Sequence, residues 1–412
     1  VLAERNAEVI RHLHRLEHPF VTDNVQQHPY WRDRAEETGL APRFSCCATS
    51  ISAWSATELS PGAQVELDRF GGEPPPAIPR SPPAEGPRRR PERAIKGGRC
   101  SLDFAVQVGI DKYLDHLPLT RQVRIMKRHG LEVTSQTLWK QLDVIAPDLQ
   151  PVYDALREYI LGHSHGVVGL DQTGWKRLTK KDKTTPYQMW CLTAPAAVLH
   201  AIKDDKSADT MVELLGDFTG TLVVDMATTH FAGARDGPGD IILAACWAHA
   251  FRKFRDAAPN HPDAIQIMNW ISQLYDLDAK AEGDVAERAR IRKEESAEVL
   301  KEMKEFLMKL PVLRSLDYGK AAQYVIGHWQ ELTRFLHDPH IPLDNNATER
   351  GIRGPVVGRR NHYGSKSRRG TEVASILYSL LETAKLNDLD PAAYLGDAVR
   401  AARRGEILLP IS

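Results

Sequence analysis

Two short apolar runs, each ending in an aspartate, constrain the fold of this 412-residue chain more than any other feature. Residues 166–171 read Gly-Val-Val-Gly-Leu-Asp, and residues 221–225 read Thr-Leu-Val-Val-Asp. Apolar runs of this length are typical of strands that are buried on both faces. Further strands are expected at 188–193, 198–203 and 241–246, with a helix at 207–215. Three strands, a helix, and then strands alternating with helices predict an α/β domain around a mixed sheet.

Both aspartates are candidates for a catalytic site. An acid at the carboxyl end of a strand faces the crevice where α/β sheets bind ligands, which favours a functional role for Asp171 and Asp225. The alternative is that each merely starts a turn, a common use of aspartate. Two such acids on neighbouring strands could reach a shared pair of metal ions.

A third acid lies in the run Leu-Asp-Asn-Asn-Ala-Thr-Glu-Arg-Gly-Ile-Arg at residues 343–353, which reads as the start of a helix. Its Glu349 fits a capping box with Asn346 as the N-cap, and this interpretation stays open. The capping box does not explain why Arg350 and Arg353 surround the acid. Three carboxylates on two strands and a helix suit a site that binds two Mg²⁺ ions and acts on a phosphodiester.

The flanking sequence predicts mainly helices. Residues 257–340 read as a helical insertion, including a long charged helix at 282–310. An amphipathic helix follows residue 370, and Asp390 followed by Pro391 predicts the cap of a last helix. Earlier, a helix at 120–130, a short turn with glycine and a capped helix from Ser135 are typical of a helix-turn-helix. An ordinary αα-hairpin explains these residues equally well. In a helix-turn-helix, the helix from Ser135 would enter the DNA major groove.

Composition limits the other possibilities. The chain has 54 basic and 54 acidic residues, so any surface for nucleic acid must be local. Five cysteines without a regular spacing (Cys46, Cys47, Cys100, Cys191 and Cys246) argue for a reducing compartment, and against disulfides or a cysteine zinc site. Cys246 and His249 alone are too few for zinc. We expect no signal peptide and no membrane helix. The missing initiator methionine suggests a fragment.

Five motifs in the same order resemble transposases of the insertion sequence sixty-six family, within the Asp-Asp-Glu transposases of ribonuclease H-like fold. They lie between about residues 112 and 395. They are Lys-Tyr-Leu-Asp-His-Leu-Pro-Leu-Thr-Arg-Gln from residue 112, Asp-Gln-Thr-Gly-Trp from 171, Cys-Trp-Ala-His-Ala-Phe-Arg-Lys-Phe from 246, Asp-Asn-Asn with Glu-Arg from 344, and Thr-Ala-Lys with Asp-Pro and Tyr-Leu from 383. Asp225 matches the acid of the second catalytic strand.

The resemblance implies a DNA transposase that cleaves a phosphodiester and transfers the strand. It makes Asp171, Asp225 and Glu349 the ligands of two Mg²⁺ or Mn²⁺ ions, and it implies no zinc. Double-stranded DNA at the element ends and the target is the expected partner, with a homo-oligomer, accessory proteins of the same element, no membrane, and the bacterial cytoplasm at the nucleoid. The candidate DNA-binding residues are Arg350, Arg353, Arg359, Arg360, Lys366, Arg368, His249, Arg252, Lys253, Gln136 and Lys140.

Four regions are predicted. They are a degenerate, disordered N-terminal segment with a Pro/Arg-rich linker at 1–98, a helix-turn-helix-like region at 99–157, a ribonuclease H-like domain at 158–370 with an insertion at about 257–340, and a helical domain at 371–412. The family's N-terminal cysteine zinc segment is not matched by Cys46 and Cys47, and Gln172 stands where the family commonly has Glu. Two alternatives therefore remain, a nuclease without strand transfer and an inactive DNA-binding remnant acting as a repressor or scaffold.

Overall fold

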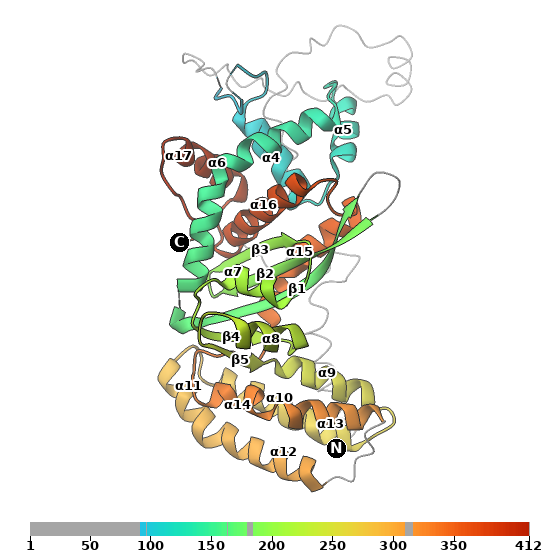
Figure 1. The fold of residues 1–412 in the computed structure, drawn as a ribbon, viewed down its shortest axis with the longest axis vertical. Helices are drawn as coiled ribbons and strands as arrows, with labels where there is room; N and C mark the ends of the chain where they lie inside the picture. Colours follow the sequence, from blue (N-terminus) through green and yellow to red (C-terminus); the bar gives the residue numbers. More distant parts are fainter. Residues whose placement is uncertain (1–90, 96, 163, 179–183, 310–315, 412) are drawn as a thin grey trace, which may run out of the picture. The chain divides into compact units, whose positions relative to one another are not determined.

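The computed structural model describes residues 91–411, except 96, 163, 179–183 and 310–315. At its centre is a five-stranded mixed sheet in the order β3-β2-β1-β4-β5 (Figure 1). β1 pairs antiparallel with β2 and parallel with β4, while β2–β3 is antiparallel and β4–β5 is parallel. The strands are β1 (Val167–Leu178), β2 (Thr184–Ala194), β3 (Ala197–Lys203), β4 (Gly220–Val224) and β5 (Ile241–Ala245). The predicted α/β class and mixed sheet are therefore confirmed.

The first strand is longer than its apolar run predicts. Asp171 lies inside β1, so the expectation that the strand ends there is wrong. The parallel pairing with β4 stops at the Gly169–Val223 pair, whereas the antiparallel pairing with β2 continues to Leu178. The outer half of β1 is mostly half-buried or exposed apart from Trp175, because β4 no longer pairs with it; near its end, Arg177 forms an isolated bridge with Ser365. Asp171 thus lies just beyond the part of β1 that pairs with β4.

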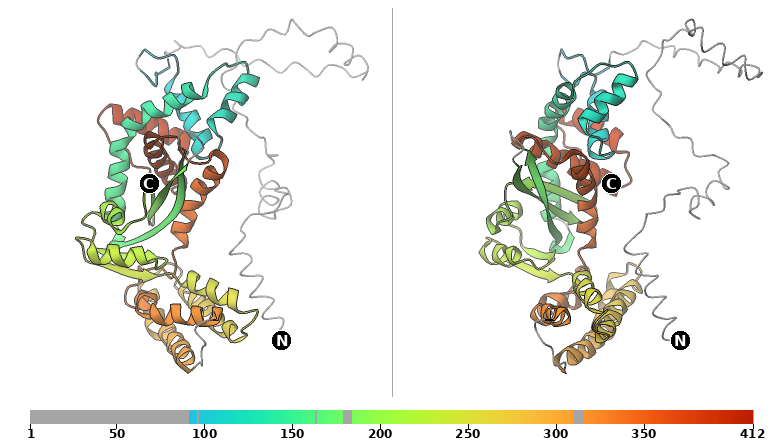
Figure 2. Two further views of the ribbon diagram at one scale, coloured as in Figure 1. Left: turned by 45° about the vertical axis from the view of Figure 1, so that its right-hand side comes forward. Right: turned by 90° about the vertical axis from the view of Figure 1, so that its right-hand side faces the viewer.

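The free edge of β3 is covered by the helix α16 (Arg368–Leu386), as Figures 1 and 2 show. Three hydroxyls spaced four residues apart on α16 accept hydrogen bonds from β3 backbone N–H groups. The Ser375 hydroxyl accepts from Ile202 at 3.0 Å, the Ser379 hydroxyl from His200 at 2.7 Å, and the Thr383 hydroxyl from Val198 at 3.1 Å. An unpaired strand edge is prone to aggregation, so this contact both satisfies and protects the edge.

Several helices pack around one long helix, α6. α6 (Ser135–Gly162) packs against α4 (Leu102–Tyr113), α16 and α17 (Pro391–Arg403), and α5 (Leu119–Arg128) precedes it. Thr134 Oγ1 accepts from the Thr137 N–H at 3.1 Å, so Thr134, rather than Ser135, is the cap at the start of α6. Asp390 caps α17 as predicted. The DNA-reading role of α6 stays a prediction, and the N-terminal expectations for residues 1–90 lie outside the described residues.

A block of helices lies between β5 and the Glu349 segment, which confirms the helical reading of about 257–340, while its status as a domain insertion stays a prediction. Its members are α9 (Trp247–Ala257), α10 (Asp263–Ala279), α11 (Val285–Ile291), η3 (Arg292–Ser296), α12 (Ala297–Lys309), α13 (Asp317–Gly327), α14 (Trp329–Thr333) and η4 (Arg334–Leu336). The expected long charged helix corresponds to α11, η3 and α12 in succession. Arg292 is buried there, donating to Asp278 at 2.7 Å and to the carbonyls of Phe335, Asp338 and Ile341.

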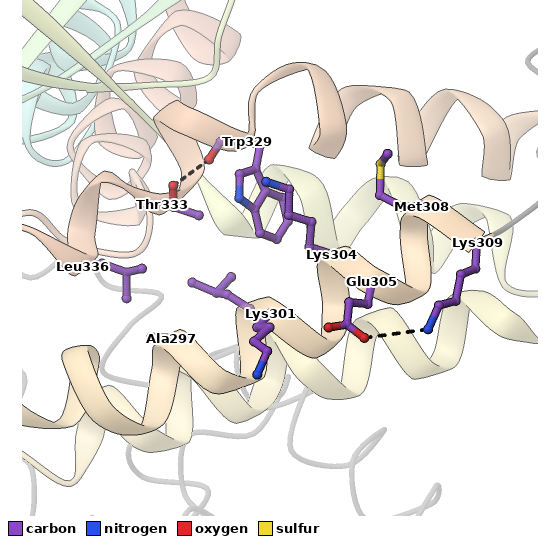
Figure 3. Close-up of a pocket in the computed structure, with 10 residues that line it drawn as sticks. Ala297, Lys301, Lys304, Glu305, Met308, Lys309, Trp329, Thr333 and Leu336 are labelled. Carbon is purple, nitrogen blue, oxygen red and sulfur yellow. Dashed lines mark hydrogen bonds and ion pairs between the residues drawn. The ribbon is translucent and has the colours of Figure 1, made fainter.

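An open groove of about 510 Å³ lies between α12 and the α14–η4 segment (Figure 3). Its surface is mostly apolar, with Met308 and the ring of Trp329 along it, and Lys304 Nζ lies 5.3 Å from the centre of that ring. None of the predicted site residues lines this groove. Within the described residues, no helix has both the length and the apolar character needed to cross a lipid bilayer.

Candidate active site

Two strands and one helix position the three predicted acids. Asp171 stands on β1, Asp225 follows directly after β4, and Glu349 lies in the first turn of α15 (Asn346–His362). β1 and β4 are adjacent parallel strands, so their carboxyl ends lie at the same edge of the sheet. The expectation that Asp171 and Asp225 lie on or directly after neighbouring strands is confirmed, and their role in a site stays a prediction.

The helix α15 lies directly against β1 because the contacting residues are small or polar. Asn345 Nδ2 donates to the Leu170 carbonyl at 3.0 Å, and the hydroxyls of Thr193 and Thr348 are 2.6 Å apart. A Cβ added at Gly169 would overlap the Thr348 hydroxyl. This close approach places the first turn of α15, with Glu349, over the strand that bears Asp171.

The capping-box interpretation of Glu349 is wrong. The residue before the helix is Asn345, whose side chain makes no capping hydrogen bond and instead holds β1. Asn346 is the first helical residue, and Asp344 Oδ1 accepts its backbone N–H at 2.9 Å. The Glu349 carboxylate is thus free of a capping role. It points to α9, where Arg252 Nη2 donates to its Oε1 at 2.6 Å.

The charges of the three acids act on one another. Burial raises the pKa of Asp171 to about 6, and the negative charges of Asp225 and Glu349 add to the rise. The hydrogen bond from the Gln172 N–H, 2.7 Å from Asp171 Oδ1, opposes it. A group whose ionised form is disfavoured by burial and by two nearby acids stands where a cation would be stabilised.

Asp225 differs because a histidine faces it. His230 of α8 (Thr228–Asp236) is fully buried, and its Nδ1 lies 3.2 Å from Asp225 Oδ1. This contact lowers the pKa of Asp225, against the opposing effect of burial. The Ala227 N–H also donates to Asp225 Oδ1 at 3.1 Å. Sequence reasoning did not find His230, since nothing in the residues 226–230 marks that pairing.

His249 completes the group. Its Nε2 lies 3.7 Å from Glu349 Oε1, and burial followed by the charge of Arg252 lowers its pKa. Cys246, at the start of the same motif, is buried and accepts the Asn345 N–H at 3.3 Å. The motif therefore links α9 to the segment that leads into α15.

The donor set suits hard divalent cations. Asp171, Asp225 and Glu349 each use one carboxylate oxygen in the contacts above, and the other oxygen of each makes no hydrogen bond or ion pair with the described residues. Three free carboxylate oxygens are the ligand type that Mg²⁺ and Mn²⁺ prefer. As the side chains stand, no three His, Cys, Asp or Glu in the described part of the chain are grouped to hold a metal. Asp225 and Glu349 are instead engaged by His230 and Arg252.

The family model described as "Transposase IS66 family" matches residues 97–373. The chain belongs to this family. It is similar to the uncharacterized protein y4jD of Sinorhizobium fredii, at 31% identity over 346 residues, covering 78% of this chain and 67% of that protein. The uncharacterized protein y4qI of the same organism is 30% identical over 338 residues, covering 76% and 62%. This IS66-family chain thus spans about two thirds of the length of these relatives.

The predicted DNA-binding residues fall into three places in this family member. Five basic side chains on or just after α15 make no ion pair within the described residues, namely Arg350, Arg353, Arg359, Arg360 and Lys366. Arg359 Nη1 lies 3.3 Å from the Thr173 hydroxyl, and Arg368 lies 3.9 Å from Glu372. On α9, Lys253 Nζ lies 4.7 Å from the centre of the Tyr324 ring.

Gln136 and Lys140 are exposed on the first turns of α6, where Lys140 pairs with Asp143 at 3.2 Å. They are not among the groups that contact the three acids. By contrast, Arg353 and Arg360 follow Glu349 by four and eleven residues, which puts all three within a narrow sector of α15. The structure therefore brings exposed arginines onto the face of α15 that bears the third acid.

Proposed function

We propose that this chain is a DNA transposase with a ribonuclease H-like catalytic domain, in which Asp171, Asp225 and Glu349 hold two Mg²⁺ or Mn²⁺ ions. The observation that supports it most is that three carboxylates, on β1, directly after β4 and on α15, lie near enough for the charges of Asp225 and Glu349 to raise the pKa of Asp171, in a chain of a transposase family. The sheet, with three antiparallel strands followed by two parallel ones, supports the fold assignment.

The acids and arginines of the chain would have separate roles in the reaction. When bound, the two ions activate the attacking oxygen and stabilise the leaving oxygen of the phosphodiester. Asp171 and Asp225 would hold both ions, and Glu349 would hold the second. Arg353 and Arg360, on the same face of α15, would bind the DNA phosphates and so position the scissile bond beside the acids.

The reaction has two steps. Water attacks a phosphodiester at the end of the element, so that one P–O bond forms as another breaks and a 3′-hydroxyl is released. That hydroxyl then attacks a phosphodiester of the target DNA, which joins the two strands. Both steps need the same arrangement of acids, because each replaces one oxygen on phosphorus with another.

The partners follow from the same proposal. The protein would act on double-stranded DNA in the bacterial cytoplasm, as a homo-oligomer that brings two ends together, with accessory proteins of the element. Gln136 and Lys140 on α6 would contact bases, and three exposed basic residues on α5 (Arg121, Arg124 and Lys127) would add phosphate contacts that the sequence reasoning did not include.

The direct test is Asp225→Asn in the full chain. DNA binding should stay nearly intact, whereas Mn²⁺-dependent nicking of a supercoiled plasmid should fall on the order of 10³-fold, the effect of losing several kcal/mol of transition-state stabilisation. Asp240→Asn, an exposed residue just before β5, is the matched control and should nick normally. Equal loss of binding and cleavage in Asp225→Asn would contradict a catalytic role.

Strand joining separates the proposal from the nuclease alternative. A labelled duplex that carries the DNA flanking this gene is incubated with the protein, Mn²⁺ and a target plasmid. Joined, labelled plasmid supports a transposase, while nicked plasmid without joining indicates a nuclease. Mn²⁺-independent binding with no cleavage would indicate the inactive DNA-binding remnant.

A further inference from the structure

Glu349 is held by an arginine from a different helix. Arg252 on α9 donates from Nη2 to Glu349 Oε1 at 2.6 Å, across 97 residues of sequence. The Arg252 side chain is 38% exposed and that of Glu349 is 31% exposed. Both side chains can therefore be reached from solvent, Glu349 by a metal ion and Arg252 by a DNA phosphate.

The pair belongs to the fold rather than to a mobile surface. The Trp247 N–H at the start of α9 donates to the Leu343 carbonyl at 2.9 Å, and the Asn345 N–H donates to Cys246 Sγ at 3.3 Å. The indole of Trp247 is buried and donates to the Leu332 carbonyl at 2.8 Å. The helix starts of α9 and α15 are thus joined directly, which brings Arg252 and Glu349 together.

This arrangement sets two ligands in competition for one carboxylate. A guanidinium binds carboxylate and phosphate groups with the same planar geometry. While Arg252 occupies Oε1 and neutralises Glu349, a divalent cation can use only the other oxygen and gains less from the reduced charge of the carboxylate. A phosphate that draws Arg252 away leaves Glu349 with an uncompensated charge and frees its oxygen.

We propose that Arg252 couples DNA binding to metal binding by lowering the metal affinity of Glu349 until a DNA phosphate takes the guanidinium. The inference rests on the proposed function, since it requires a metal at Glu349 and DNA beside it. Coupling between two sites is reciprocal, so DNA should raise the affinity for the metal, and the metal should raise the affinity for DNA, by the same factor. Arg252 is therefore a positioning residue that acts on Glu349, and it is not itself a metal ligand.

The first experiment measures Mn²⁺ binding to the full chain without DNA, by the electron paramagnetic resonance signal of free Mn²⁺. Arg252→Gln should bind Mn²⁺ about tenfold more tightly than the wild type, within the range typical of coupling between sites. Lys253→Gln removes the same charge one residue further along and does not contact Glu349. If the two variants gain equally, only the general charge matters and the proposal is overturned.

The second experiment adds a short DNA duplex, with the Mn²⁺ bound by the duplex alone subtracted. The wild type should gain about tenfold in Mn²⁺ affinity, and Arg252→Gln should gain little, because its Glu349 is already free. An equal gain in both proteins would refute the coupling. Circular dichroism checks that Arg252→Gln is folded. If it is not, Arg252→Lys, which keeps the charge but loses the planar fork, should gain about threefold without DNA, and no gain would refute the proposal.

One further variant separates this inference from the proposed function. Asp225→Asn should weaken Mn²⁺ binding at least tenfold if the ion occupies the predicted site. A Mn²⁺ affinity that is unchanged in Asp225→Asn would contradict the proposed metal site itself. Binding that responds to Asp225→Asn, but is the same in Arg252→Gln and Lys253→Gln, would leave the proposed function in place and remove the role given to Arg252.

Discussion

Replacing Asp171 with asparagine should stabilise the metal-free protein at pH 8. Burial and the two neighbouring acids raise the pKa of Asp171 to about 6, from an ordinary value of 3.8. The difference of about 2 corresponds to roughly 3 kcal/mol of unfavourable charge in the native state at 1.36 kcal/mol for each pKa unit. Because the carboxylate is only partly buried, solvent screening should reduce this to about 1–2 kcal/mol. Asparagine keeps the shape and the acceptor for the Gln172 N–H and removes the charge.

The raised pKa of Asp171 also fixes how stability changes with pH. Between about pH 3.8 and 6 the native state of the wild type binds a proton that the unfolded state releases, so wild-type stability falls as the pH rises through this window. The advantage of Asp171→Asn should therefore be full at pH 8, about half at pH 5, and absent near pH 3.5. Thermal unfolding in EDTA, followed by circular dichroism, should show a midpoint raised by roughly 2–4 °C at pH 8.

The same substitution at the neighbouring acid should have the opposite effect on stability. Asp225→Asn should destabilise the same metal-free protein at pH 8, because His230 lowers the pKa of Asp225 and so favours its charged form. Opposite signs for two identical substitutions would be hard to obtain from general charge effects. The reasoning is refuted if Asp171→Asn lowers the midpoint at pH 8, or raises it equally at pH 8 and pH 3.5.

Two further predictions concern α15. Arg353→Ala should make the slope of log affinity for DNA against log salt shallower by about 0.9, the effect of one phosphate contact. Arg290→Ala, an exposed arginine paired within the insertion, should leave the slope unchanged, and an unchanged slope in Arg353→Ala would exclude its phosphate contact. Gly169→Ala should lower the free energy of unfolding by roughly 1–3 kcal/mol, because its Cβ would overlap the Thr348 hydroxyl. Gly327→Ala, with nothing within 4 Å of the added Cβ, should cost nothing in the same urea titration, and a tolerated Gly169→Ala would contradict the close packing of α15 on β1.

Much of the sheet was predictable because the patterns are local. The runs before Asp171 and Asp225 are apolar without interruption, so they had to become buried strands. The start of α17 was equally clear, since Asp390 followed by proline is a strong capping signal. Where the burial pattern became mixed, as in the outer half of β1, the sequence failed, because a two-stranded extension has no continuous apolar run.

The sequence alone therefore located the five strands, though not the length of β1, most of the helices, and three acids whose types suit divalent cations. Tertiary structure alone decided which side chain each acid faces. His230 with Asp225, Arg252 with Glu349, and the hydroxyls of α16 on the edge of β3 are contacts between separate elements, most of them distant along the chain. Such pairings depend on the packing of helices against a finished sheet, and no local pattern of hydrophobicity or charge encodes them.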